Sequence, residues 1–122
     1  MSYIDGFVVP VKTSRKQEYI EMAKKMSTRY LEWGATSYVE CWGDDVTDGK
    51  VTDFKRAVAA QPDETVVFSW VVWPTKAARE AGNKRMMDDP EMKQWMQSQK
   101  DPPFNMQRMI MSGFEAIVEV RR

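Results

Sequence analysis

Apolar residues along this chain follow two different periods. From Tyr3 to Val11 the run YIDGFVVPV is apolar and rich in β-branched residues, which predicts a strand with a bulge at Gly6. From Ser14 to Gly34 apolar residues instead recur every three or four positions, and Ser14 and Gln17 have the spacing of a capping box. This second pattern predicts an amphipathic helix that ends at Gly34.

The middle of the chain holds three further candidate strands. Residues 36–42 (TSYVECW) have strand composition, and the polar stretch GDDVTDGK behind them is rich in turn residues. Residues 51–60 (VTDFKRAVAA) fit either a strand or a short helical turn, and we favour a strand. Residues 65–73 (TVVFSWVVW) are apolar except for Ser69, which is typical of a central strand covered on both faces.

The last third of the chain combines helical and extended signals. A second helix is expected after Pro74, with Gly82 as a weak point inside it. It ends before Pro90, which starts a short third helix. Residues 106–120 predict a final strand bent near Gly113.

The order of elements is therefore β-α-β-(β)-β-α-α-β, and no linker or repeat divides the chain. This order predicts a single α+β domain over residues 1–122, of the split βαβ type, in which helices cover one face of an antiparallel sheet.

The third strand also predicts an oligomer. Alternate residues from Val66 to Val72 point to one face of the sheet and those from Val67 to Trp73 point to the other, and both sets are mainly apolar. Helices on one face can cover only one set. A second copy of the chain would remove the other set from water, at about 25 cal/mol per Å². We therefore expect a homodimer whose two sheets form a shared barrel.

Charge and composition narrow the class of function. Eighteen basic and eighteen acidic residues leave a formal net charge of zero, which argues against nucleic acid and membrane surfaces as partners. Cys41 is the single cysteine and no export signal is found, so we expect a cytoplasmic protein. The absence of histidine excludes Ser-His and Cys-His catalytic pairs and nearly every zinc site, and we expect neither a metal nor a cofactor.

Three further patterns have an ordinary structural interpretation. The acidic loop from Asp44 to Gly49 has valine and lysine at two positions where a calcium loop requires acidic ligands, so we interpret it as a solvated turn. Cys41 is expected to be a small buried hydrophobe. The methionine-rich segment 86–96 is expected to supply a helix face for the core or an interface rather than a soft-metal site.

Two charged residues inside apolar strands give the candidate ligand site. Glu40 shares a strand face with Trp42, and Arg108, in the predicted last strand, shares one with Phe114. If both charges enter one pocket, they orient a polar group of a ligand, with Trp42, Trp70 and Phe114 as apolar walls. The alternative is a structural ion pair or a solvent-facing pair at a strand end, because a buried charge requires a partner in either case.

Several longer segments together point to a known family: YIDGFVVPV, VECWGDDVTDGKVTDFKRAV, VVFSWVVWPTKAARE, NKRMMDDPEM and RMIMSGFEAIVE. Over nearly its whole length the chain resembles the YbaA-like bacterial proteins, which form domain of unknown function 1428. The resemblance implies a dimeric α/β barrel of ferredoxin-like fold, and it is weakest between Met96 and Met106. It implies no activity and supplies no catalytic residues.

Two functions therefore remain open. The chain binds or transforms a small molecule in a pocket between helices and sheet, or it is a non-enzymatic dimeric module for regulation or protein interaction. The lack of histidine favours the module and disfavours haem degradation, because no axial ligand of that type is present. The fold alone does not decide between these two functions.

Overall fold

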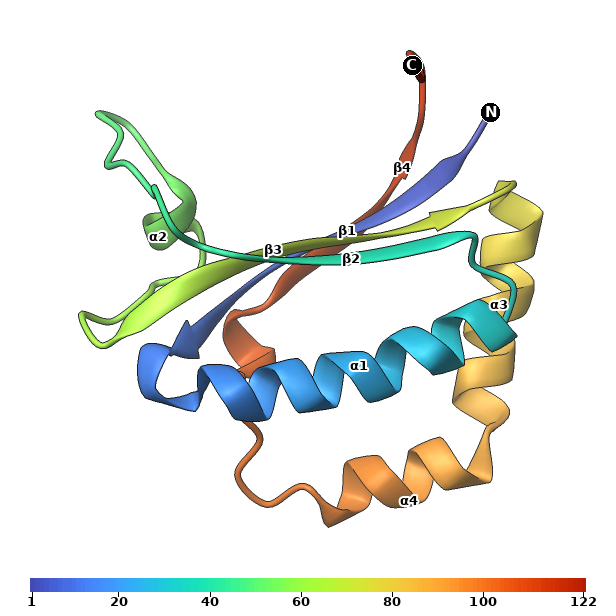
Figure 1. The fold of residues 1–122 in the computed structure, drawn as a ribbon, viewed down its shortest axis with the longest axis horizontal. Coiled ribbons are helices and arrows are strands. Elements are labelled where there is room, and N and C mark those ends of the chain that lie inside the picture. Colours follow the sequence, from blue (N-terminus) through green and yellow to red (C-terminus); the bar gives the residue numbers. More distant parts are fainter.

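A four-stranded antiparallel sheet forms the centre of the computed structural model, which describes all 122 residues (Figure 1). Its strands are β1 (Tyr3–Lys12), β2 (Ser37–Trp42), β3 (Glu64–Trp73) and β4 (Ile110–Glu115). Their spatial order is β2-β3-β1-β4, so β3 is a central strand, as the sequence predicts. This order is the split βαβ arrangement of ferredoxin-like folds, which confirms the predicted fold class.

Three helices cover one face of the sheet, as expected. They are α1 (Lys16–Glu32), α3 (Lys76–Asp88) and α4 (Pro90–Ser98). In Figure 1, α1 lies directly beneath the sheet, α3 crosses one end of it, and α4 lies further from it than α1. The side chain of Asp89 accepts hydrogen bonds from the first N–H groups of α4, which explains why a new helix opens at Pro90. None of the helices combines the length and the apolar character that a membrane span requires.

The first helix begins differently from the prediction. Ser14 and Gln17 form no capping box, because a 3₁₀ turn over Thr13–Arg15 precedes α1. The hydroxyl of Thr13 instead donates to the carbonyl of Asp63, at 3.3 Å. The end of the helix is as predicted: Gly34 has a φ of 112°, a conformation that favours glycine, and it closes the last turn.

Residues 51–60 do not form the expected strand. They contain α2 (Phe54–Ala57), a short helix capped by the side chain of Asp53. Phe54 and Val58 are four residues apart, so both lie on the same side of the turn. Val58 is buried, and the ring centroid of Phe54 lies 6.0 Å from that of Phe68. The spacing of four between Phe54 and Val58 is therefore the feature of this segment that indicates the short helical turn, the alternative to the favoured strand.

The last strand is shorter than the predicted range 106–120. The side chain of Asn105 caps a single 3₁₀ turn over Met106–Arg108, so the strand starts only at Ile110. Its one neighbour is β1, and the pair Tyr3–Glu115 is the last of their ladder. Residues beyond it have no partner strand to extend the pairing. Arg108 consequently lies outside the sheet, which corrects the prediction that it shares a strand face with Phe114.

Alternate residues of each strand point to opposite faces, which we call the covered face and the open face. On the covered face, Val67, Val71 and Trp73 pack against residues of α1 in two buried clusters. On the open face, Phe68 remains 45 % exposed, so the predicted division of β3 is confirmed. The other open-face residues of the paired strands are Ile4, Gly6, Val8, Pro10, Lys12, Ser37, Val39, Cys41, Glu64, Val66, Trp70, Val72, Ile110, Ser112 and Phe114.

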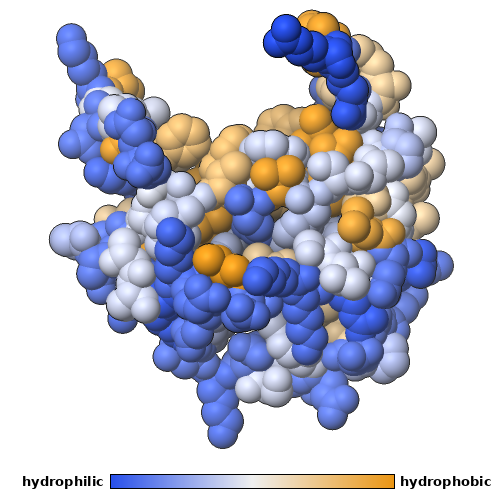
Figure 2. Space-filling view, in the orientation of Figure 1, coloured by the Kyte–Doolittle hydropathy of each residue, from blue (hydrophilic) through white to orange (hydrophobic).

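Two segments rise from the open face and leave a trough between them (Figures 1 and 2). One is the loop of residues 43–60 with α2. The other is the C-terminal segment after β4, which Ser2 holds through bonds to Ala116 at 3.1 Å and to the carboxylate of Glu119 at 2.7 Å. Figure 2 shows hydrophobic residues on the floor of the trough. The open face is thus apolar and hollowed between two walls.

Candidate functional site

A carboxylate bonded by two tyrosine hydroxyls lies between α1 and the sheet. Glu40 of β2 accepts a hydrogen bond from Tyr19 of α1 at 2.8 Å and one from Tyr38 of β2 at 2.5 Å. The two hydroxyls bond different oxygens of the carboxylate. We call these three residues the Tyr–Glu–Tyr cluster.

Strand and helix periods bring the cluster together. Tyr38 and Glu40 are two residues apart in β2, so both point to the covered face. Tyr19 and Ala23 are four residues apart on the face of α1 that packs on the sheet. In the adjacent strand Ser69 pairs directly with Glu40, so its side chain points to the same side as the carboxylate.

The tyrosines of this region act as hydrogen-bond donors. Burial raises the pKa of the Tyr19 and Tyr38 hydroxyls, and the negative charge of Glu40 and the bond to it raise the pKa of both further. Burial also raises the pKa of Tyr30 to about 12, with smaller contributions from the charges of Asp5 and Glu40. All three hydroxyls therefore stay protonated at neutral pH. Each Glu40 oxygen accepts one tyrosine hydrogen bond and keeps a further lone pair for a ligand.

The Tyr–Glu–Tyr cluster forms the wall between two cavities. The first, which we call the outer cleft, has a volume of about 360 Å³ and runs between α1 and β2, where Trp42 and Val67 line it. The second, which we call the inner cavity, has about 110 Å³ and extends from the cluster towards β1. All three residues of the cluster line both spaces.

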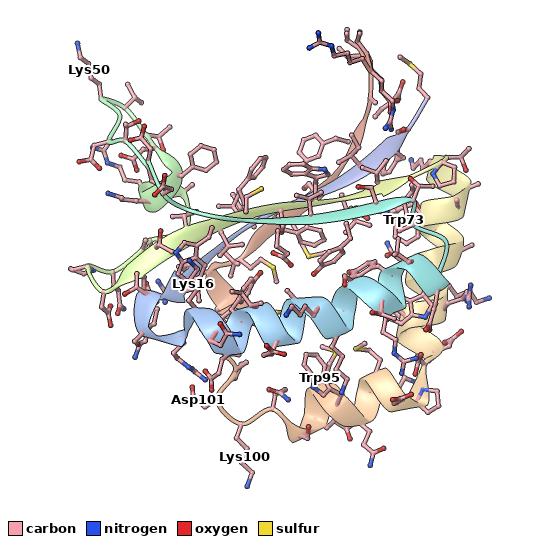
Figure 3. All side chains as sticks on the ribbon, in the orientation of Figure 1. Lys16, Lys50, Trp73, Trp95, Lys100 and Asp101 are labelled. Atoms are coloured by element: carbon pink, nitrogen blue, oxygen red, sulfur yellow. The ribbon has the colours of Figure 1, made fainter.

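Positive charge and an aromatic ring lie together in the outer cleft. The ammonium group of Lys16 lies 5.3 Å from the ring centroid of Trp42, within the range of a cation–π contact. Figure 3 shows Lys16 near the first turn of α1, on the side of the helix that faces the sheet. Lys24, one of the exposed residues of α1, lines the same cleft. The outer cleft thus presents two ammonium groups near its opening and one carboxylate at its inner wall.

The structure does not bring the five predicted site residues into one pocket. Glu40 and Trp42 line the outer cleft, but Trp70 and Phe114 lie on the open face, on the other side of the sheet. Trp42 pairs with Val67 whereas Trp70 pairs with Val39, and this register sends the two tryptophans to opposite faces. The predicted pocket with all five residues is therefore corrected to a cleft that contains two of them.

Arg108 has a structural partner, as the alternative interpretation held, but that partner is Glu64. Its guanidinium donates two hydrogen bonds to the Glu64 carboxylate, both 2.7 Å long, and a third to the carbonyl of Ala59 at 2.9 Å. The side-chain bond from Arg108 lowers the pKa of Glu64, against an opposing effect of burial. Arg108 thus joins the loop before β4 to the start of β3.

A buried carboxylate, Asp5, was missed by the sequence analysis. Asp5 is 5 % exposed and accepts a hydrogen bond from the indole N–H of Trp73 at 2.9 Å. Its other oxygen lies 2.9 Å from a guanidinium nitrogen of Arg79 in α3. Asp5 is a charge inside an apolar strand, which is the same signal that singled out Glu40, so the pattern could have identified it. Both its oxygens are bonded within the chain, and neither main cavity reaches it.

The remaining candidates have structural positions. Cys41 is half-buried, and Asp53 caps α2 with its carboxylate. Of the methionines in segment 86–96, Met92 is buried in the core, while Met87 and Met96 are exposed on the protomer. No group of three or more acidic or cysteine side chains lies close enough to hold a metal ion.

Comparisons with known proteins agree on the family. Residues 2–106 match the profile of a family described as "Protein of unknown function (DUF1428)". The chain is 50 % identical over 119 residues to the "Uncharacterized protein YbaA" of Escherichia coli K12, covering 98 % of this chain and 99 % of the relative. The protein of the same description in Shigella flexneri matches to the same extent.

Two solved structures share the fold at 10 % sequence identity. One is a "dimeric ferredoxin-like protein" from an uncultured marine organism, with a TM-score of 0.57 over 98 % of this chain and all of that one. The other is an "uncharacterized NIPSNAP-like domain protein" from Burkholderia xenovorans, with a TM-score of 0.57 over 99 % of this chain and 90 % of that one. At this identity the likeness supports the ferredoxin-like fold and nothing about activity.

Proposed function

The chain belongs to the DUF1428 family of proteins of unknown function, and we propose that it is a homodimer that binds a small organic molecule in the outer cleft. The observation that carries the proposal is the Tyr–Glu–Tyr cluster. It holds a carboxylate, with an acceptor site left on each oxygen, at the inner wall of a cavity.

The chemistry of the outer cleft suits a ligand with two different ends. At the inner wall, Glu40 accepts a hydrogen bond from a ligand O–H or N–H group, and a bond to a charged acceptor contributes about 1.5–3 kcal/mol. Near the opening, Lys16 and Lys24 attract a carboxylate or phosphate group. Between the two ends, Trp42 and Val67 provide apolar surface for the body of the ligand.

The test of ligand binding is a thermal-shift screen against metabolites, repeated with a Glu40→Gln variant. Glutamine keeps the size of the side chain but removes its charge, so a compound that stabilises the wild type should bind about tenfold more weakly. Glu80→Gln on α3 is the matched control, because Glu80 is exposed and far from the cleft, and this variant should keep the shift. A ligand that stabilises all three proteins equally would exclude the outer cleft as its site.

The homodimer rests on the open face. Apart from Lys12 and Glu64, which pair at one end of the β1–β3 ladder, that face carries no charged side chain over the paired strands, and Phe68 and Phe114 are large apolar side chains exposed on it. Exposed apolar patches of this kind mark association surfaces. The description of one structural neighbour as a dimer of the same fold also supports a second copy as the occupant. Light scattering at micromolar concentration should give twice the mass of the chain, and a monomer at that concentration would reject the dimer.

A second candidate function is a dimeric module for regulation or protein interaction, without a ligand. The hollowed trough of the open face favours it, because its two walls leave exposed apolar groups such as Val51 and Val120 for contact with another chain. If no compound raises the melting temperature in the screen, this candidate gains. For both candidates we propose the cytoplasm as the compartment, because the single cysteine forms no intrachain disulfide.

A further inference from the structure

The inner cavity differs from the outer cleft in both size and chemistry. Ten of its 12 lining residues are hydrophobic, and the two others are Glu40 and Ser69. Met22 and Met26 of α1 line one side, and Phe104 and Met109 of the segment before β4 line another. No lysine or arginine lines it. A single carboxylate in an apolar space therefore determines what the cavity accepts.

Ser69 gives an independent sign that a ligand group belongs in this cavity. It is 6 % exposed and lines the cavity, but its hydroxyl takes part in none of the side-chain hydrogen bonds of the chain. No side-chain polar atom that is sealed from solvent lacks a hydrogen-bond partner. The hydroxyl of Ser69 must therefore open into the cavity, where it can donate and accept one hydrogen bond each.

The positions of Glu40 and Ser69 define where a ligand oxygen would lie. The two residues are direct partners across β2 and β3. Side chains in such pairs start about 4.5–5.5 Å apart at their Cβ atoms, so one atom between them can reach both. A carboxylate only accepts hydrogen bonds, and the protons of the two tyrosine hydroxyls are already bonded to it. The incoming group must therefore donate a hydrogen bond of its own to Glu40. A hydroxyl group suits both partners, because it donates a hydrogen bond to Glu40 and accepts one from Ser69 without bringing a charge into an apolar cavity.

Volume and charge restrict the rest of the ligand. An apolar protein cavity of about 150 Å³ holds a benzene molecule. The inner cavity, at about 110 Å³, is slightly smaller, and the flexible thioethers of Met22, Met26 and Met109 can make room for a ring. A carboxylate, a phosphate or a phenolate would meet the charge of Glu40 without a cation to offset it.

We propose that the inner cavity binds a neutral single-ring alcohol of the phenol class, whose hydroxyl donates to Glu40 and accepts from Ser69. The inference deepens the proposed function and rests on it, because the same carboxylate serves both cavities. It assigns a ligand group to the other side of that carboxylate: an uncharged hydroxylated ring on the inner side of Glu40. The raised pKa of Tyr19 and Tyr38 beside Glu40 illustrates the same preference for a protonated phenol.

The experiment is a titration of the full-length protein with phenol, followed by NMR of methionines labelled at the methyl carbon. The methyl signals of Met22, Met26 and Met109 should shift and saturate, while those of the exposed Met87 and Met96 should stay fixed. Toluene, which has a methyl group in place of the hydroxyl, should bind at least about tenfold more weakly, because it makes no hydrogen bond to Glu40 or Ser69.

Two variants test the assigned hydrogen bonds. Ser69→Ala should weaken phenol binding roughly three- to tenfold and leave toluene binding unchanged, since only the hydroxyl contact is lost. Ser112→Ala on the open face is the matched control and should change neither. Equal binding of phenol and toluene, or full phenol affinity in Ser69→Ala, would overturn the inference even if the methyl signals shift.

The indole N–H signal of Trp42 separates this inference from the proposed function, because Trp42 lines the outer cleft and not the inner cavity. If phenol shifts the Trp42 signal but none of the three methyl signals, the ligand lies in the outer cleft and the inner cavity is not its site. If phenol shifts neither while a metabolite from the screen still depends on Glu40, the proposed function stands and the phenol inference fails. If no compound shifts any of these signals, both fail.

Discussion

The two faces of the sheet depart from the arrangement that is usual for a sheet with helices on one side. Such a sheet normally has an apolar covered face and a polar open face. Here the covered face carries Asp5, Glu40 and Ser69, whereas the only charged side chains that the paired strands place on the open face are Lys12 and Glu64, at one end of the β1–β3 ladder. Two carboxylates and a serine hydroxyl therefore lie in the interior of this protomer, and an apolar surface lies on its open face.

The difference indicates that the two faces serve different purposes. Charges under the helices are expensive to bury, and they persist here because each has partners: Asp5 has Arg79 and Trp73, and Glu40 has two tyrosines. An apolar open face needs a different explanation, which association supplies. Substitutions on the covered face should therefore change the protomer, and those on the open face should change its assembly.

The largest effect is expected from removing a buried charge of the covered face. Asp5→Ala should lower the free energy of unfolding by about 3–5 kcal/mol, because it leaves the Arg79 guanidinium and the Trp73 indole without their acceptor. Urea unfolding followed by fluorescence measures the loss. Glu80→Ala removes an exposed partner of the same arginine and should cost less than about 0.5 kcal/mol. Similar losses in the two variants would mean that the pair is not a buried one.

The ion pair of Arg108 and Glu64 is expected to contribute less and to depend on pH. Arg108→Ala should destabilise the protein by about 2–3 kcal/mol at neutral pH, because the Glu64 side chain is only 5 % exposed. Arg108 lowers the pKa of Glu64 in the folded state, so the stabilisation is present above the unfolded value, about 4.3. It is lost as the pH falls through the lower folded pKa.

Unfolding curves near neutral pH and near pH 3 would check this sign. The wild type and the Arg108→Ala variant should differ in stability near neutral pH and converge in acid. Arg121→Ala, which removes an exposed arginine at the C-terminus, is the control and should match the wild type at both. A constant difference across the whole pH range would show that Arg108 stabilises the fold through packing rather than through Glu64.

The contrast between Arg108 and Glu40 shows which side-chain positions the sequence can predict. Glu40, Tyr38 and Trp42 were placed on one face correctly, because alternation within a strand is local. Arg108 was misplaced because its position depends on the Asn105 cap and on where the ladder of β1 and β4 ends, and no run of apolar residues encodes either.

The separation of the two tryptophans follows from the same limit. Trp42 and Trp70 lie in strands that their composition predicted correctly. Whether the two tryptophans share a face, however, depends on the register between β2 and β3. A shift of one residue in that register would exchange the faces, and only tertiary packing sets it. The contribution of Tyr19 to the cluster likewise requires α1 to cross β2 at one position. The sequence therefore identifies residues of the site but does not predict that Tyr19 and Glu40 come into contact.

A smaller effect is expected where α3 packs against the sheet. Gly82 lies well inside α3, and a methyl group there would overlap the ring of Trp73 and lie 3.0 Å from the carbonyl of Trp33. Alanine would gain about 1 kcal/mol in helix propensity, but the overlap should dominate and destabilise the fold by about 1–2 kcal/mol net. Lys84→Ala on the exposed side of the same helix should stay within about 0.5 kcal/mol. If Gly82→Ala stabilises the protein in urea unfolding, the close approach is not essential.

The smallest change in protomer stability is expected at Phe68 of β3, and comparison with its buried neighbour Val67 gives the sharpest test of the two faces. Val67→Ala removes a side chain 1 % exposed on the covered face, and its melting temperature should fall equally at every protein concentration. Phe68→Ser alters the open face, where the ring is 45 % exposed, and should change the unfolding free energy of the isolated protomer by less than about 1 kcal/mol.

The proposed dimer makes the melting temperature of the wild type rise with protein concentration, because association stabilises the folded chain by mass action. Phe68→Ser should abolish that rise, whereas Val67→Ala should keep it. Calorimetry of the three proteins over a hundredfold range of concentration would measure both slopes. Phe68→Ser could instead keep the slope and lower the melting temperature equally at all concentrations. Residues on the open face would then stabilise the protomer itself, and the assignment of association to that face would be wrong.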